Sequence, residues 1–233
     1  MQQFNVHILC TRPIEQSLIE TAANKRIDIE VVSFIETEPL QTIEVQQEIE
    51  QALLQSATVI FTSGNAVEAV ATELEGHDPE WEIFCLGNTT RELVSKYFGE
   101  QHISGIADNA IELAEIVATT SDSDEVIFFC GDQRRQELPD SLREKGIEVE
   151  EIVVYQTIAL PRKLEKKYEA ILFFSPTAVK SFFEFNIADP KAIFFSIGNT
   201  TASEIRKYSK NKVMISDEPS KERMVEMVVE YFT

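Results

Sequence analysis

Hydroxyl side chains stand at corresponding places in two pairs of similar motifs, where they could bind an anion. FTSGNAV begins at Phe61 and FFSPTAV begins at Phe173, while GNTT begins at Gly87 and again at Gly198. Each motif follows an apolar run and precedes a stretch with helical periodicity, so each marks a loop between a strand and a helix. Because free N–H groups at helix N-termini attract anions, these loops are candidates for binding a small polyanion.

The candidate binding residues all lie where an apolar run ends, in a loop or in the first helical turn after it. They are Arg12, Thr62, Ser63, Asn88, Thr89, Thr90, Gly131, Arg135, Ser175, Thr177, Thr200 and Thr201. The arginines could make bidentate contacts with carboxylates, although surface salt bridges would explain them nearly as well. For any single loop a capped helix is the simpler interpretation, with Ser63 and Ser175 as N-caps. Because the motifs recur in pairs, we favour several loops that face one binding cleft.

Short β-rich runs alternate with helical patterns along the chain. The expected strands are 4–10, 27–34, 57–62, 82–86, 125–130, 147–155, 169–174, 192–197 and 212–215. The expected helices are 15–24, 66–74, 89–97, 110–117, 136–145, 178–185, 201–207 and 221–231, and IEVQQEIEQ from Ile43 also has helical character. This alternation predicts an α/β fold with parallel sheets covered by helices on both faces. In such sheets ligands gather at the carboxyl ends of the strands, where the candidate residues stand.

Charge and composition argue against several classes of protein. The net charge of -19 argues against nucleic-acid binding, which needs basic patches. No apolar run approaches the roughly 18 residues of a membrane span, and the N-terminus lacks the features of a signal peptide, so we expect a cytoplasmic protein. Cys10, Cys85 and Cys130 lie far apart and the histidines show no ligand spacing, so we expect neither a metal site nor a disulfide. There is no Walker P-loop, GxGxxG or GxSxG motif.

The motif pairs recur in one order, which indicates an internal duplication. A third and fainter pair joins LCTRP…RIDIEVV, from Leu9, to FCGDQ…GIEVEEIVVY, from Phe129, and chance similarity of apolar strands could explain this pair alone. The three displacements are nearly equal, so the sequence predicts a repeated unit of about 115 residues. The residues by themselves thus predict a two-unit α/β protein that binds an anionic small molecule, and they do not name a reaction.

The chain resembles the uroporphyrinogen-III synthase family. LCTRP, FTSGNAV, GNTT, FFCGDQRRQELPDSLREKGIEVEEIVVYQT, FFSPTAV and SIGNTTA match the family's pattern in order and spacing over nearly the full chain. The resemblance implies two flavodoxin-like or Rossmann-like domains, one formed by residues 1–35 with 160–233 and the other by residues 36–159. Strands near 30–36 and 152–159 would pair as a two-stranded connector between these domains.

The resemblance also implies an activity in porphyrin biosynthesis, including that of haem and sirohaem. The family cyclises hydroxymethylbilane, a linear tetrapyrrole, to uroporphyrinogen III with inversion of ring D and loss of water, which makes it a carbon–oxygen lyase. The tyrosine of its VVYQT motif is the usual candidate for the proton donor, so Tyr155 is the candidate general acid here, although a packed aromatic carries equal weight. A monomer without cofactor or metal is implied. The alternative is a non-catalytic binding or regulatory protein for an anionic metabolite.

Overall fold

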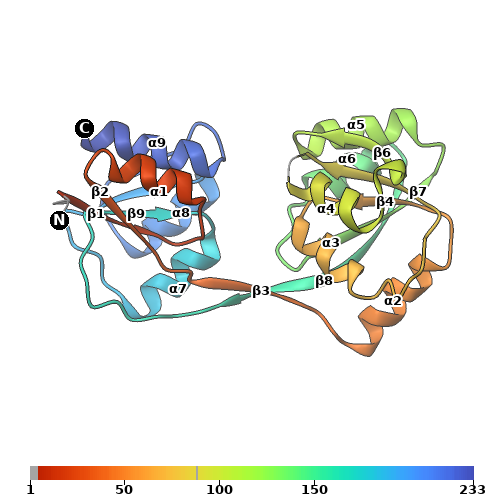
Figure 1. The fold of residues 1–233 in the computed structure, drawn as a ribbon, viewed down its shortest axis with the longest axis horizontal. Coiled ribbons are helices and arrows are strands. Elements are labelled where there is room, and N and C mark those ends of the chain that lie inside the picture. Colours follow the sequence, from red (N-terminus) through yellow and green to blue (C-terminus); the bar gives the residue numbers. More distant parts are fainter. Residues whose placement is uncertain (1–4, 88) are drawn as a thin grey trace. The chain divides into compact units, whose positions relative to one another are not determined.

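The chain folds into two compact units. The computed structural model describes residues 5–87 and 89–233. The first unit comprises Met1–Glu36 and Ile158–Thr233, and the second comprises Thr37–Thr157 (Figure 1). The chain therefore passes between the units twice, within two strands that are hydrogen-bonded neighbours, β3 (Ile35–Pro39) and β8 (Glu148–Ala159).

The first unit is a parallel sheet with helices on both faces. Its strand order is β11-β10-β9-β1-β2. The strands are β1 (Val6–Cys10), β2 (Ile27–Val31), β9 (Ala170–Phe173), β10 (Ile193–Ser196) and β11 (Val213–Ile215). Helices α1 (Gln16–Ala23) and α9 (Lys221–Phe232) share one core with the sheet, and α7 (Pro176–Phe185) and α8 (Asn199–Tyr208) share the other.

The second unit repeats this arrangement with one further strand. Its order is β3-β8-β7-β4-β5-β6, and β4 to β8 are parallel. The remaining strands are β4 (Ala57–Phe61), β5 (Trp81–Leu86), β6 (Ile103–Ala107) and β7 (Glu125–Gly131). Helices α2 (Ile43–Leu53), α3 (Gly64–Ala71) and α4 (Thr89–Tyr97), with the short 3-10 helix Glu100–His102, lie on the side of one core, which we call the α2–α4 core. Helices α5 (Ala110–Thr120) and α6 (Glu137–Glu144) cover the other, the α5–α6 core.

Burial on both faces explains why the strands are almost continuously apolar. Ile60 belongs to the α5–α6 core and its neighbour Phe61 to the α2–α4 core, and both side chains are fully buried. In the first unit Phe194 and Phe195 divide in the same way between the two cores. Strands covered by helices on both sides need apolar residues at successive positions. The predicted α/β fold with parallel sheets is thus confirmed.

The sequence repeat and the structural unit do not coincide. FFSPTAV and FTSGNAV follow the middle strands β9 and β4, GNTT follows β10 and β5, and LCTRP and FCGDQ end β1 and β7. The first unit therefore combines LCTRP of the first repeat with FFSPTAV and GNTT of the second repeat. The second unit combines FCGDQ of the second repeat with FTSGNAV and GNTT of the first repeat. The structure supports the third and faintest pair of similar motifs, LCTRP…RIDIEVV and FCGDQ…GIEVEEIVVY. Arg26 and Gly146 stand at corresponding places in this pair, shortly before β2 and β8, and both have positive φ angles, of 62° and 85°.

Two strands differ from the prediction. β6 was not expected, because Gly105 interrupts its apolar pattern. A Cβ atom at Gly105 would lie 2.7 Å from Ile116 and 2.7 Å from Phe84, so close packing of α5 and β5 takes the space of a side chain. The strand assigned to residues 30–36 also differs, because Glu30 and Val31 end β2 and the strand that joins the second sheet begins at Ile35.

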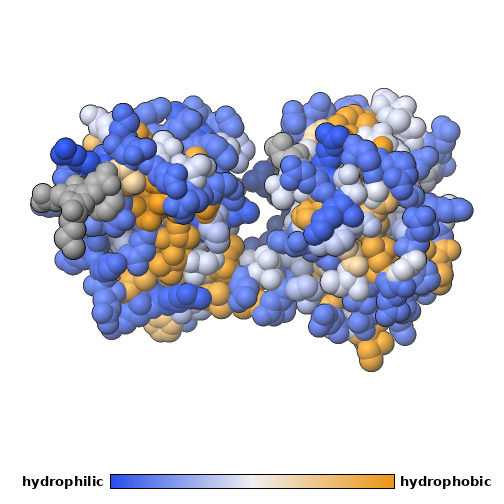
Figure 2. All heavy atoms as spheres, in the orientation of Figure 1, coloured by the Kyte–Doolittle hydropathy of each residue, from blue (hydrophilic) through white to orange (hydrophobic). Residues whose placement is uncertain are grey.

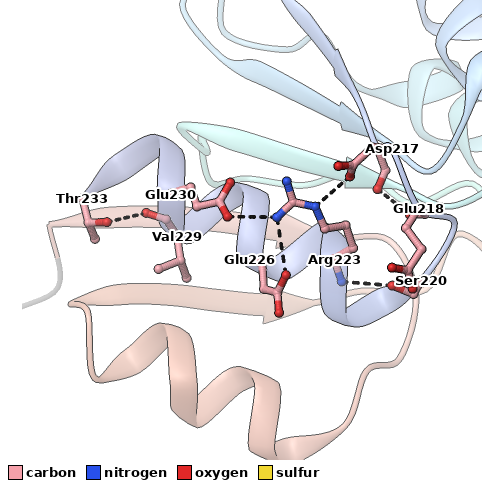
Figure 3. Close-up of polar contacts among 9 residues, drawn as sticks. Asp217, Glu218, Ser220, Arg223, Glu226, Val229, Glu230 and Thr233 are labelled. Carbon is pink, nitrogen blue, oxygen red and sulfur yellow. Dashed lines mark hydrogen bonds and ion pairs between the residues drawn. The ribbon is translucent and has the colours of Figure 1, made fainter.

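The C-terminal helix α9 is held by a cluster of charges within the first unit. Arg223 donates to Asp217 at 2.7 Å, to Glu230 at 2.9 Å and to Glu226 at 3.4 Å (Figure 3). Hydrogen bonds to Glu230 and Asp217 raise the pKa of this guanidinium above its usual value. The visible surface of both units is mostly hydrophilic (Figure 2). No helix within the described residues has the length and apolar character needed to cross a membrane.

Candidate active site

Four loops of the second unit emerge at one edge of its sheet. Because β4, β5, β6 and β7 are parallel neighbours, the segments that follow them share the carboxyl edge. Thr62 and Ser63 follow β4, Thr89 begins the helix after β5, and Gly131 ends β7. The structure thus brings these four predicted residues to the same edge of one sheet. Asn88, which was also predicted, lies outside the described residues.

Ser63 caps helix α3. Its backbone is extended, with φ -145° and ψ 135°, and its hydroxyl oxygen accepts a hydrogen bond from the amide of Asn65 at 3.2 Å. The same oxygen accepts the hydroxyl proton of Tyr155 at 3.1 Å. The capping role was expected, whereas the contact with Tyr155 joins two residues that are 92 positions apart in the chain.

Tyr155 lies half-buried on β8 beside a small cavity. Its ring packs against the α2–α4 core. The cavity has a volume of about 80 Å³ and is lined by Thr37, Glu38, Pro39, Asn65, Glu68 and Tyr155. None of the first five was predicted, because their role depends on how β3 and α3 lie beside β8 and no motif marks them. The half-buried phenol therefore packs against the core and also lines a small cavity together with residues of β3 and α3.

The two threonines of each GNTT motif have different surroundings. Thr89 and Thr200 are exposed, whereas Thr90 and Thr201 are 7% and 2% exposed. The first of each pair can therefore reach a ligand with its side chain, and the second faces the core. Within the residues described, the amides of Asn199, Thr200 and Thr201 at the start of α8 have no acceptor. Such amides remain available to an anion.

The other candidates of the first unit lie on its own carboxyl edge. Ser175 caps α7 and accepts the amide of Ala178 at 3.1 Å. Thr177 is half-buried in the first turn of that helix. Arg12, which follows β1, is exposed, and no carboxylate in the described part of the chain pairs with it. The first unit thus offers one arginine and two helix N-termini at this edge.

The two arginines after β7, Arg134 and Arg135, differ in their ion pairs and in their exposure to solvent. Arg134 donates to Glu151, which also accepts from Arg143 at 2.7 Å. Arg135 is 79% exposed and lies 4.0 Å from Glu137. Arg135 is therefore the more available of the two for a ligand, and Arg134 ties the loop to β8.

Asp132, which follows β7, holds the neighbouring strand β8 in place. Its carboxylate accepts the amide of Thr157 at 2.9 Å, and its own amide donates to the carbonyl of Tyr155 at 3.1 Å. The two bonds hold β8 on either side of Gln156, directly after Tyr155. A local sequence signal was absent, because the partner lies 25 positions away.

The three cysteines are buried near the ends of β1, β5 and β7. Burial raises the pKa of Cys10, Cys85 and Cys130 to about 11 in each case. Each thiol is therefore protonated at neutral pH and unsuited to act as a nucleophile. In the part of the chain that the structure describes, no three His, Cys, Asp or Glu side chains are grouped as a metal site would require.

Comparison with known proteins agrees with this architecture. The family described as uroporphyrinogen-III synthase HemD matches residues 16–226. The uroporphyrinogen-III synthetase of Helicobacter pylori 26695 is similar in fold, with a TM-score of 0.64, 18% identity, and 97% of this chain and 99% of that chain covered. A mutant uroporphyrinogen III synthase from the extremely thermophilic bacterium Thermus thermophilus gives a TM-score of 0.59 at 14% identity, covering 97% of this chain and 98% of that chain. Because the family match spans most of the sequence, the chain belongs to the uroporphyrinogen-III synthase family.

Proposed function

We propose that the protein cyclises hydroxymethylbilane to uroporphyrinogen III, with inversion of ring D and loss of water, and so acts as a carbon–oxygen lyase of tetrapyrrole biosynthesis. The observation that carries this proposal is the family match over residues 16–226. The arrangement of Ser63, Gly131 and Tyr155 supports it, because these residues of three separate motifs meet at one edge of the second unit.

Each of the two sheets carries hydrogen-bond donors for an anionic substrate at its own carboxyl edge. The linear tetrapyrrole carries eight carboxylates, and each needs a partner when it leaves water. Thr62, Thr89, Thr200 and the amides at the start of α8 would donate hydrogen bonds. Such bonds to a charged group contribute roughly 1.5–3 kcal/mol each. Arg12 and Arg135 would add bidentate contacts. Thr90 and Thr201 would act through backbone amides, since their side chains are buried.

Tyr155 would protonate the leaving hydroxyl. Its proton would pass to the substrate oxygen while the carbon–oxygen bond breaks and the electron pair of that bond leaves with water. The azafulvene cation that forms would close through a spiro intermediate. The proton lost when the last pyrrole regains its aromaticity would restore the phenol. Because hydroxyl departure from such an electron-rich pyrrole is easy, the main contribution would be orientation, which holds the chain so that only one closure is reachable.

The assay for this proposal separates product isomers. Pure protein is added to freshly made hydroxymethylbilane, the product is oxidised, and the porphyrins are resolved by chromatography. We expect type III porphyrin in excess. Type I alone, the product of the uncatalysed reaction, would contradict the proposal, and tight binding of the bilane without type III product would identify a binding protein instead. We further propose that the protein acts as a monomer in the cytoplasm without a cofactor.

A further inference from the structure

The ladder between β7 and β8 contains a bulge just before Tyr155. Cys130 pairs with Val153 and the next residue, Gly131, pairs with Tyr155, so Val154 is an extra residue on β8. In a regular strand successive side chains point to opposite faces. Val153 contacts the α5–α6 core, but Val154 and Tyr155 both contact the α2–α4 core. The bulge therefore turns the side chain of Tyr155 to the face on which α3 lies, as bulges beside functional sites often do.

Gly131 leaves the space that the turned ring occupies. A Cβ atom at this position would lie 2.4 Å from Cζ of Tyr155 and 2.7 Å from its hydroxyl oxygen. Real Cβ atoms essentially never approach so closely, so any other residue at position 131 would displace the ring. The absence of a side chain at Gly131 therefore allows the observed position of the Tyr155 ring, whether or not the Gly131 amide also contacts a ligand.

Ser63 fixes the hydroxyl at the far end of the ring. Its oxygen accepts from Tyr155 at 3.1 Å and from the amide of Asn65 at 3.2 Å. Because the second bond caps α3, the acceptor is held by the helix. At the corresponding place in the other repeat, Ser175 accepts the amide of Ala178 and, within the described residues, no tyrosine donates to it. The contact with a phenol therefore belongs to the second unit alone.

We propose that Ser63 and Gly131 are positioning residues for Tyr155. The bulge turns the phenol toward α3, the glycine makes room for its ring, and the serine orients its hydroxyl beside the small cavity that Tyr155 helps to line. The proposal rests on the proposed function insofar as it supposes that the phenol donates a proton there. It also assigns the Ser63 hydroxyl to Tyr155 and not to the substrate.

A double-mutant cycle tests this assignment. For Ser63→Ala we expect kcat to fall about tenfold with KM within about twofold, since orientation is lost and substrate contacts are kept. Adding Ser63→Ala to Tyr155→Phe should change kcat by less than about twofold, because a positioning residue acts only through its partner. Ser220→Ala is the matched control, since Ser220 caps α9 by accepting the amide of Arg223 at 3.1 Å and, among the described residues, bonds to no tyrosine. Losses that multiply, or a raised KM with unchanged kcat, would overturn the proposal.

A spectroscopic measurement separates this proposal from the proposed function. The protein has five tyrosines, so labelling with ¹³C at Cζ gives few signals, and Tyr155→Phe identifies one of them. We expect that signal to shift in Ser63→Ala and in Gly131→Ala and to stay in place in Ser220→Ala. An unmoved signal in Ser63→Ala would refute the positioning role even if the enzyme makes type III product. A shifted signal in a protein that makes only type I product would refute the proposed function and support the hydrogen bond.

Discussion

Replacing Glu151 by glutamine should destabilise the second unit, because this carboxylate holds two arginines. Its side chain is 14% exposed, while the side chains of Arg134 and Arg143 are 27% and 44% exposed. Arg134 anchors the loop after β7 and Arg143 anchors α6, so one carboxylate joins two elements to β8. Glutamine keeps the shape, but it removes the charge and turns an NH₂ group toward a guanidinium.

The size of the effect follows from the burial of the three side chains. Breaking a fully buried ion pair costs about 3–5 kcal/mol, whereas an exposed pair contributes about 0–1 kcal/mol. The carboxylate is well shielded and the arginines are partly solvated, so we expect Glu151→Gln to lower the free energy of unfolding by about 2 kcal/mol, between these limits.

Urea unfolding monitored by tryptophan fluorescence measures this change. Trp81 is the single tryptophan of the chain, it is 3% exposed, and it belongs to the second unit, so its emission reports on that unit. Glu150→Gln is the control, since Glu150 is the exposed neighbour and no cation in the described residues pairs with it. A difference between the two variants of less than about 0.5 kcal/mol, the usual scatter of surface substitutions, would show that Glu151 does not hold the two arginines to any effect on stability.

The same pair predicts how the effect depends on pH. Burial raises the pKa of Glu151, and the hydrogen bonds from Arg134 and Arg143 lower it by more, so the pKa lies below its usual value. A carboxyl whose pKa is lowered by folding stabilises the protein above its unfolded pKa, which is about 4.3 for glutamate, and loses that contribution as the pH falls. The difference between wild type and Glu151→Gln should therefore be full at pH 7 and shrink below about pH 4.3. A constant difference down to pH 3 would contradict this sign.

Three further predictions follow from single residues or from the expected chemistry. Tyr155→Phe should fold normally and lose about one to two orders of magnitude in kcat, measured by the isomer assay, and near-wild-type turnover would return the residue to a packing role. Ser181→Ala should raise the free energy of unfolding by about 1 kcal/mol, because the buried Ser181 hydroxyl has no hydrogen-bond partner among the described residues and the other repeat has Ala69 at the corresponding place. Thermal melts followed by circular dichroism measure this change, and a clear loss of stability would show that the hydroxyl has a partner. Dialysis against a chelator should leave turnover unchanged, and activity that returns only with added metal would reverse the expectation of a metal-free enzyme.

The sequence predicted the fold because strands buried on both faces leave a continuous apolar pattern. The runs around Ile60 and Phe173 carry this pattern clearly, and the capping serines after them, Ser63 and Ser175, mark the helix starts. β6 was not predicted, because Gly105 interrupts its apolar pattern. Phe84 and Ile116 fill the space that a side chain at position 105 would take, and these contacts cannot be read from the local sequence.

The candidate site was less predictable, since it depends on contacts between distant segments. The GNTT motif does not say which threonine faces solvent, and the buried Thr90 and Thr201 became clear only from how the helices lie on their sheets. The bulge after Cys130 changes the direction of Tyr155 without any sign in the motif. Asp132 likewise acts on a strand that lies far away in sequence.

We propose above all that this protein directs the ring closure of hydroxymethylbilane. Its most direct test is the fraction of type III porphyrin measured as the concentration of protein is raised at a fixed amount of fresh hydroxymethylbilane, with heat-denatured protein as the control. We predict that the fraction rises with the native protein until type III is nearly the sole product and that the denatured protein gives type I. A product that remains type I at every concentration of native protein would contradict it.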